Sequence, residues 1–221
     1  MLPVFVHCEG AVVHIDERTG SKKSRGQTRA ALDIATELVN EGVDPTNISI
    51  LSPYIANGME NPVYFISSAR YPDKTQLTPS TVELIRQLRQ LPSYEPLVLM
   101  GEASTVDSFQ GQENDIIIVV MGTSFPQPGP GFTADPHRLN VLLTRQRCGL
   151  VVVGNVDLRG PGSYDGGWGG GRGGGRGGAK PHAFLVVSPS GERQWVGAPM
   201  LQHIHRRMIE NGRVVRINAR E

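Results

Sequence analysis

Four runs of almost uninterrupted aliphatic residues constrain the fold of this chain more than any other feature. They are residues 3–8 (PVFVHC), 48–51 (ISIL), 115–121 (DIIIVVM) and 149–155 (GLVVVGN). Each is too apolar to be a strand with one wet face, so each predicts a strand buried on both sides. Segments with helical spacing separate them. Buried strands separated by helices predict an α/β fold, in which a parallel sheet is covered by helices on both faces.

Local signals place the other elements. Apolar spacing predicts a helix over residues 27–40, which Gly42 ends, and a second helix over 82–91. A third helix is expected over 135–147, with Asp135 as N-cap and Pro136 in the first position. Further strands are expected at 97–100, before Val106, at 183–188 and near 214–217, with a helix over 200–211 and a loop over 126–132. Residues 56–80 carry no clear pattern.

Residues 160–178 differ in composition from the rest of the chain, with twelve glycines (GPGSYDGGWGGGRGGGRGG). Such a stretch cannot bury a core, so disorder is predicted. It divides the chain into a body over 1–158, an insertion over 159–180 and a closing strand and helix of the same domain over 181–221. From residue 159 onward, ten Lys/Arg and four Asp/Glu give +6, which leaves −5 on residues 1–158 of the net +1. Contact with a polyanion outside a specific site is therefore expected to depend on the basic tail.

The cysteines and the hydropathy of the chain indicate the cellular compartment in which it is expected. The two cysteines, Cys8 and Cys148, adjoin apolar runs and are expected to be buried free thiols. Neither zinc spacing nor a disulfide framework is present, which favours a reducing compartment. No apolar run reaches membrane-spanning length, and the first ten residues do not resemble a signal peptide. We therefore expect an intracellular protein, cytoplasmic or nuclear, without a membrane partner.

Two polar motifs adjoin the predicted strands. SPY (52–54) ends one strand, and TVDSFQGQE (105–113) directly precedes the most apolar one. Ligands of parallel α/β sheets bind at the carboxyl ends of the strands. A buried strand needs no polar preamble to fold, so these residues are expected to gather on one edge of the sheet as a binding site.

TVDSFQGQE resembles motif V of superfamily 1 helicases of the up-frameshift type, and RLNVLLTRQR (138–147) resembles their motif VI. SPY resembles a further short family motif, with Asn57 where a glutamine is usual. SRGQTRAAL (24–32) resembles a helix start in which Gln27 replaces an asparagine and Ala30 a glutamate. APMLQHIHRRMIENG is similar to the closing helix. The order agrees with the family, over residues 3–155 and again after the glycine stretch.

The resemblance implies the second of two RecA-like domains that hold ATP between them. The chain contains no Gly-Lys dipeptide, hence no Walker A loop, and Asp16-Glu17 is better explained as a solvated turn than as a magnesium site. ATP with Mg²⁺ would be held mainly by a missing first RecA-like domain. That domain and single-stranded RNA or DNA are the implied partners. The chain alone is not expected to hydrolyse ATP.

The resemblance also implies roles for single residues. Arg145 would be the arginine finger that stabilises charge on the γ-phosphate, and Arg138 would assist or pair with a carboxylate. Seven residues separate them, so one helix would present both on nearly the same face. Gly111, Glu113 and Gln110 would serve the nucleotide, with Gly111 allowing close approach or a positive φ. Hydrogen bonding within the turn remains the alternative for Gln110 and Asp107. No metal ligand set is expected, and His203 with His205 lacks a third ligand.

The remaining expectations concern nucleic acid. Thr105 would position the backbone, with Pro53 and Tyr54 near the same groove, although Tyr54 could equally be a buried structural residue. Arg172 and Arg176 lie among glycines and aromatic residues, a composition typical of weak nucleic-acid binding, with a plain linker as the alternative. Three hypotheses follow: the domain of a helicase motor, a non-catalytic RNA-binding adaptor that relies on its Arg-Gly-Gly stretch, or a fragment of a longer helicase.

Overall fold

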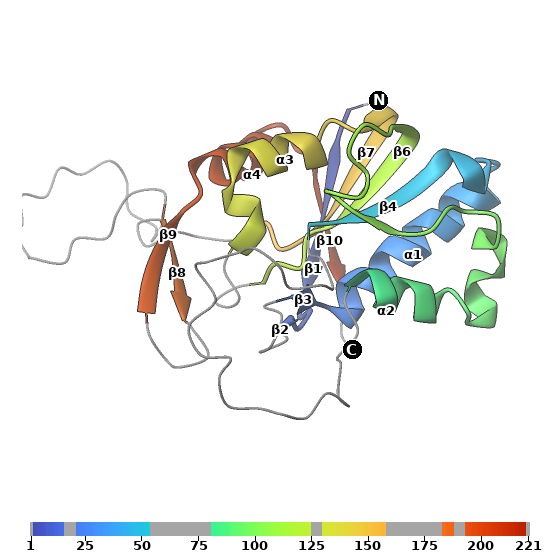
Figure 1. The fold of residues 1–221 in the computed structure, drawn as a ribbon, viewed down its shortest axis with the longest axis horizontal. Coiled ribbons are helices and arrows are strands. Elements are labelled where there is room, and N and C mark those ends of the chain that lie inside the picture. Colours follow the sequence, from blue (N-terminus) through green and yellow to red (C-terminus); the bar gives the residue numbers. More distant parts are fainter. Residues whose placement is uncertain are drawn as a thin grey trace, which may run out of the picture.

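A computed structural model describes residues 2–15, 21–53, 81–124, 130–157, 183–187 and 193–219. A six-stranded sheet in the order β10-β1-β7-β6-β4-β5 forms its centre (Figure 1), and all five neighbouring pairs are parallel. The strands are β1 (Val4–Glu9), β4 (Ile48–Ser52), β5 (Ser104–Thr105), β6 (Asn114–Val120), β7 (Gln146–Gly154) and β10 (Val214–Asn218). The predicted parallel α/β fold is therefore confirmed.

Helices cover both faces of the sheet (Figure 1). One face packs against α1 (Arg25–Asn40), α2 (Thr81–Leu88) and the 3-10 helix η2 (Pro92–Leu97). The other face packs against α3 (Pro136–Leu142) and α4 (Pro199–Glu210). The shorter elements are β2 (His14–Ile15) with β3 (Lys22–Lys23), β8 (Ala183–Val187) with β9 (Arg193–Gly197), η1 (Pro45–Asn47) and η3 (Gly131–Ala134). β10 adds an edge strand beside β1, and α4 covers part of the second face of the sheet.

The predicted end at Gly42 and the predicted N-cap at Asp135 are confirmed, and α1 begins two residues before the predicted start, with Ser24 as its N-cap. The Ser24 hydroxyl accepts a hydrogen bond from the Gln27 N–H at the start of α1, and Gly42 adopts φ +97° just after its end. Asp135 accepts hydrogen bonds from the N–H groups of His137 and Arg138 at the start of α3. These contacts satisfy main-chain groups that have no partner inside the helix.

Two predicted elements are wrong. Residues 97–100 form no strand: Leu97 ends η2 and a turn follows it, and the Arg89 guanidinium donates to the carbonyl oxygens of Leu97, Met100 and Gly101 at 2.8–3.0 Å. The helix predicted over 135–147 ends at Leu142. Residues from Gln146 onward instead pair with β6, so sheet pairing overrides a locally helical sequence.

One cysteine also departs from expectation. Cys8 is buried in β1, and burial raises the pKa of its thiol to about 12. Cys148, expected to be buried, is exposed because it lies in the first part of β7, before the buried portion of that strand.

Several expectations fall outside the described residues. They concern Asp16-Glu17, Tyr54, the segment 56–80 and the whole insertion over 159–180, which includes Arg172 and Arg176. Within the ranges that the structure describes, no helix is both long enough and apolar enough to cross a membrane.

Candidate functional site

The motif over 105–113 joins opposite rims of the sheet. Thr105 pairs with Ser52 at the carboxyl ends of β5 and β4, which we call the carboxyl rim. Glu113 directly precedes Asn114, the first residue of β6, at the opposite or amino rim. Both β5 and β6 run parallel to β4, so the connection between them must return across the sheet. The expectation that all polar motifs gather on one edge is therefore wrong: they divide between the two rims.

Hydrogen bonds within the turn hold its first half. The hydroxyl of Thr105 accepts from the Ser108 N–H at 3.2 Å, and the hydroxyl of Ser108 accepts from the Thr105 N–H at 2.9 Å. The Phe109 side chain is buried beneath them. The Thr105 hydroxyl therefore helps to hold the turn. The residue is partly exposed, so an oxygen lone pair of this hydroxyl remains available to a ligand.

The second half of the turn is open to solvent. Gly111 adopts φ +79°, and a Cβ built there would meet no atom within 4 Å. Of the two predicted reasons for this glycine, the positive φ is confirmed, and close approach of a nucleotide stays a prediction. Gln110 and Glu113 are exposed, and the side chains of both make no hydrogen bond or ion pair with the described part of the chain.

Arg145 lies at the amino rim beside the end of this turn. Its carbonyl oxygen accepts a hydrogen bond from the Asn114 N–H at 3.2 Å, and its Nε donates to the carbonyl oxygen of Val141 at 3.1 Å. The side chain is half-buried. Among the described residues, no carboxylate lies within 4.0 Å of its guanidinium, whereas the next arginine, Arg147, is 2.9 Å from Asp115.

Arg138 occupies a different setting. It belongs to α3, where its guanidinium lies 4.0 Å from the ring centre of Phe132 and its Nε lies 4.0 Å from a carboxylate oxygen of Asp135. Arg145 follows the end of the helix, so the expected shared helix face for the two arginines is wrong. The expected pairing of Arg138 with a carboxylate is present, and stacking on an aromatic ring adds to it.

Asn114 holds the amino rim together, a role that sequence reasoning missed. Its side-chain amide donates to the carbonyl oxygen of Thr46 at 3.0 Å and to the hydroxyl of Ser49 at 2.9 Å. Together with the main-chain bond to Arg145, these contacts tie β4, β6 and β7 at one level. In the sequence, an asparagine directly ahead of an apolar run could have indicated a residue that anchors the start of the strand.

At the carboxyl rim, the side chain of Gln27 joins α1 to the residues that follow β6. Its amide nitrogen donates to the carbonyl oxygen of Thr123 at 2.7 Å, and its amide oxygen accepts from the Gly122 N–H at 3.0 Å. The residue is fully buried. The family-like position of Gln27 in the helix start therefore serves to dock α1 onto the end of β6.

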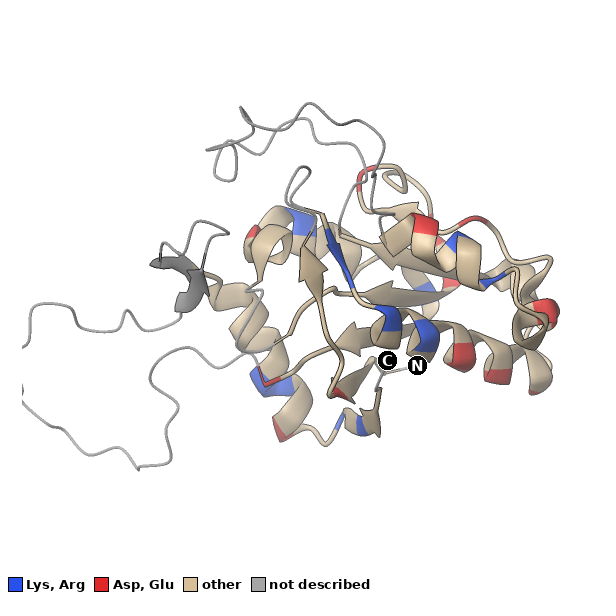
Figure 2. Ribbon diagram, turned by 90° about the horizontal axis from the view of Figure 1, so that it is seen from below, with Lys and Arg blue, Asp and Glu red and all other residues tan. Residues whose placement is uncertain are grey.

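The residues expected near nucleic acid are only partly described. Pro53 directly follows β4 at the carboxyl rim and is buried, so it directs the chain rather than offering a surface. Arg25 and Arg29 lie in the first two turns of α1, and Asp33 and Glu37 follow at the same four-residue spacing, so that bands of positive and then negative charge run along the helix (Figure 2). The partial positive charge of the helix N-terminus adds to the two guanidinium groups, so this end of α1 is cationic.

A buried histidine lies between α4 and the sheet. His205 packs edge-on against Phe5, with ring centres 5.2 Å apart, and neither of its ring nitrogens has a hydrogen-bond partner in the described structure. Burial lowers the pKa of His205 to about 4. His7 lies close by: its Nδ1 accepts from the Val156 N–H at 3.0 Å, and burial also lowers its pKa.

Charged groups border this histidine pair. Arg216 donates two hydrogen bonds to the carboxylate of Asp157, at 3.0 and 3.1 Å, and a weaker one to Glu9 at 3.4 Å. Asp157 also lies 3.6 Å from Nε2 of His7. Across the described residues, no group of three His, Cys, Asp or Glu side chains has the arrangement of a metal site.

Comparisons with known proteins show the family to which the chain belongs. Residues 2–157 match the family model described as an AAA domain. The chain is 33% identical over 154 residues to "Regulator of nonsense transcripts 1" of Caenorhabditis elegans, which covers 68% of this chain and 12% of that protein. It is 31% identical over 123 residues to "ATP-dependent helicase NAM7" of Saccharomyces cerevisiae, covering 55% and 10%. A third relative, "DNA polymerase alpha-associated DNA helicase A" of the same yeast, is 31% identical over 145 residues, covering 65% and 17%. The chain thus spans less than a fifth of these relatives.

Proposed function

We propose that this chain, which belongs to the AAA domain family and is a second RecA-like domain of a superfamily 1 helicase of the up-frameshift type, supplies an arginine finger to ATP held by a first RecA-like domain. Arg145 is that finger. The domain itself is residues 1–158 and 181–221, with 159–180 as an insertion. The first domain would supply the phosphate-binding loop and the magnesium ligands.

The setting of Arg145 is the observation that carries this proposal. Its guanidinium is partly exposed and has no carboxylate partner among the described residues, so it can still pair with an anion brought by a facing domain. A triphosphate held by that domain would be such an anion. The main-chain bond to Asn114 holds Arg145 in place before the nucleotide arrives, and preorganised charge of this kind is effective in phosphoryl transfer.

The neighbouring residues fit the same ligand. Glu113 is exposed next to the strand start that holds Arg145, so its carboxylate is free to accept hydrogen bonds from a ribose. Gln110 and Gly111 lie in the same exposed half-turn. Arg138, stacked on Phe132 and paired with Asp135, would support the site rather than reach the phosphate.

Nucleic acid would bind on the carboxyl rim. Support comes from the position of Thr105 there and from the cationic start of α1, where Arg25 and Arg29 lie. These groups suit the phosphate backbone of a single strand, RNA or DNA, without reading its sequence. Tyr54, Arg172 and Arg176 would add stacking and charge. Two ligands on opposite rims of one rigid sheet would thus be joined by the turn over 105–113. A nucleic-acid ligand and two free cysteines are consistent with the cytoplasm or the nucleus.

The proposal is tested by ATP turnover with and without a first RecA-like domain. The purified chain should show no ATPase activity stimulated by single-stranded RNA or DNA. Fusion to the first RecA-like domain of a related helicase should restore it, because the second half of the phosphate cage is then present. Turnover by the chain alone that survives repurification, or a fusion that binds ATP but remains inactive, would argue against the assignment.

A further inference from the structure

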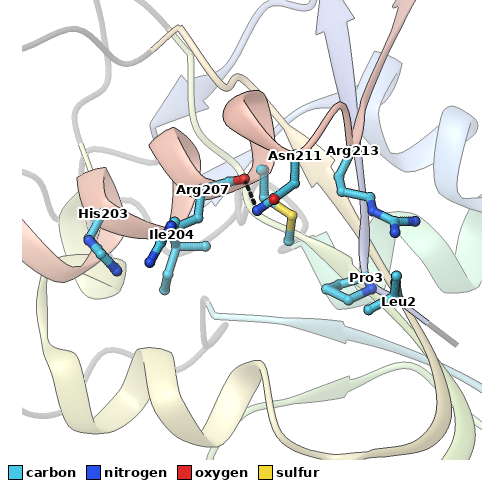
Figure 3. Close-up of a pocket in the computed structure, with 8 residues that line it drawn as sticks. Leu2, Pro3, His203, Ile204, Arg207, Asn211 and Arg213 are labelled. Atoms are coloured by element: carbon cyan, nitrogen blue, oxygen red, sulfur yellow. Dashed lines mark hydrogen bonds between the residues drawn. The ribbon is translucent and has the colours of Figure 1, made fainter.

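A shallow groove of about 390 Å³ lies at the amino rim, apart from Arg145 and the turn over 105–113. It is formed by α4, the residues before β1 and the residues before β10. Figure 3 shows His203 and Arg207 on α4 toward one end of the groove, and Arg213 with Leu2 and Pro3 toward the other. The groove thus combines side chains from three segments that are distant in the sequence.

The polar lining of the groove is basic. His203, Arg207 and Arg213 line it together with the neutral Asn211, and no carboxylate does. Within the described structure the guanidinium of Arg213 has no ion-pair partner. Arg207 has only Glu210, at 3.9 Å and with both side chains largely exposed, which is a weak interaction. These cations are therefore available to an anionic ligand.

The segment that carries most of the groove is more basic than the rest of the domain. Residues 1–158 carry a net charge of −5, whereas the described segment 193–219 carries five arginines and one glutamate, hence +4. An acidic ligand would be repelled by most of the domain and attracted to this segment. The charge distribution therefore favours an anionic ligand on this segment over one on residues 1–158, and Arg207 and Arg213 are its arginines in the groove.

The floor of the groove is apolar. Leu2, Ile204 and Met208 line it, and Leu2 is 59% exposed. A nucleic-acid backbone or a free phosphate would leave these groups uncovered, since neither offers an aliphatic side chain. A peptide that combines carboxylates with one large apolar side chain would cover the floor and neutralise the rim at once.

We propose that this groove binds an acidic segment of a protein partner, in which one large apolar residue enters between Leu2, Ile204 and Met208 and flanking carboxylates meet Arg207 and Arg213. The lining residues of the groove do not include Arg145 or the turn over 105–113, although both surfaces lie at the amino rim. The groove adds a protein partner to the nucleotide and nucleic-acid ligands of this domain.

Fluorescence anisotropy with a labelled peptide tests the proposal. The probe is a short peptide in which glutamates flank a single leucine, and the matched peptide has alanine in place of the leucine. The chain should bind the first peptide saturably and the second at least about tenfold more weakly, because the apolar anchor is lost. Equal affinity for the two peptides, or no saturable binding of either, would overturn the proposal.

Variants of the chain locate the binding. Arg207→Gln and Arg213→Gln should each weaken the leucine peptide by about tenfold, and Leu2→Glu should do so by repulsion. Arg206→Gln is the matched control, since Arg206 is an exposed arginine of the same helix outside the groove. Unchanged urea midpoints will show that the variants are folded. A similar loss in Arg206→Gln, or displacement of the peptide by single-stranded RNA in proportion to charge, would assign the effect to general electrostatics and contradict the proposal.

Discussion

The N–H of Asn114 donates a hydrogen bond to the carbonyl oxygen of Arg145, with 3.2 Å between nitrogen and oxygen. This bond joins the residue that follows the motif over 105–113 to a residue within the motif over 138–147. It therefore links the end of that turn to the backbone of the proposed finger. The other end of the same turn lies at Thr105 on the carboxyl rim, so nucleic acid and ATP would be linked through one short segment.

The positive φ of Gly111 gives a prediction about stability. Gly111→Ala should lower the free energy of unfolding by about 1–2 kcal/mol, because an L-residue is strained at φ +79°. Urea unfolding measures this. Gly101→Ala is the matched control, since a Cβ there also meets nothing within 4 Å and its φ is not in the left-handed region. Equal effects of the two substitutions would contradict the assignment of strain.

The buried amide of Gln27 gives a second prediction. Gln27→Ala should lower the free energy of unfolding by about 2–4 kcal/mol, because it leaves the Gly122 N–H and the Thr123 carbonyl without partners in the interior. Gln87→Ala serves as the control, since Gln87 is exposed and bonds only to Glu83. A decrease in the free energy of unfolding of less than about 0.5 kcal/mol for Gln27→Ala would show that these hydrogen bonds between α1 and the end of β6 are dispensable.

The buried imidazole of His205 predicts a dependence on pH. Its folded-state pKa of about 4 lies below the ordinary value of 6.5, so the unfolded chain binds the proton more strongly. This contribution to stability is complete above pH 6.5 and is lost as the pH falls from about 6.5 to about 4. Between pH 7 and pH 5 the loss should be about 2 kcal/mol.

Urea unfolding of His205→Leu at both pH values isolates this effect. The variant should lose the part of the dependence that His205 causes. A smaller dependence of the same sign will remain, since burial also lowers the pKa of His7, while Asp157 opposes that shift. An identical dependence in the variant and the natural chain would show that another group is responsible.

The glycine-rich stretch predicts a salt effect. Deletion of residues 160–178 should weaken binding of single-stranded RNA and reduce the slope of log affinity against log salt by about 1–1.5, because Arg172 and Arg176 are removed. Anisotropy over a salt series measures both. Unchanged affinity at low salt would favour a plain linker and exclude the adaptor hypothesis, which depends on these arginines.

Much of this architecture was predictable from the sequence. The strands that became β1, β4, β6 and β7 are nearly continuous aliphatic runs, and no other element can bury them. The caps at Ser24 and Asp135 follow from local chemistry that tertiary contacts do not disturb.

Long-range contacts decided the rest. Residues 143–147 have helical spacing, but the chain leaves the helix after Leu142, and from Gln146 onward it pairs with β6 in the sheet. Residues 97–100 look like a strand, but three hydrogen bonds from Arg89 hold them in a turn. The division of the polar motifs between two rims follows from strand order, which no local pattern reveals.

Single-turnover hydrolysis of ATP by the chain fused to a first RecA-like domain is the most direct test of the central claim. Arg145→Ala should lower the rate of hydrolysis by about 10³-fold or more while ATP affinity changes far less, because the guanidinium acts on charge that develops in the transition state. Arg147→Ala, which removes a neighbouring arginine already paired with Asp115, should hydrolyse ATP at nearly the unmodified rate. Equal rates for Arg145→Ala and Arg147→Ala would contradict the account.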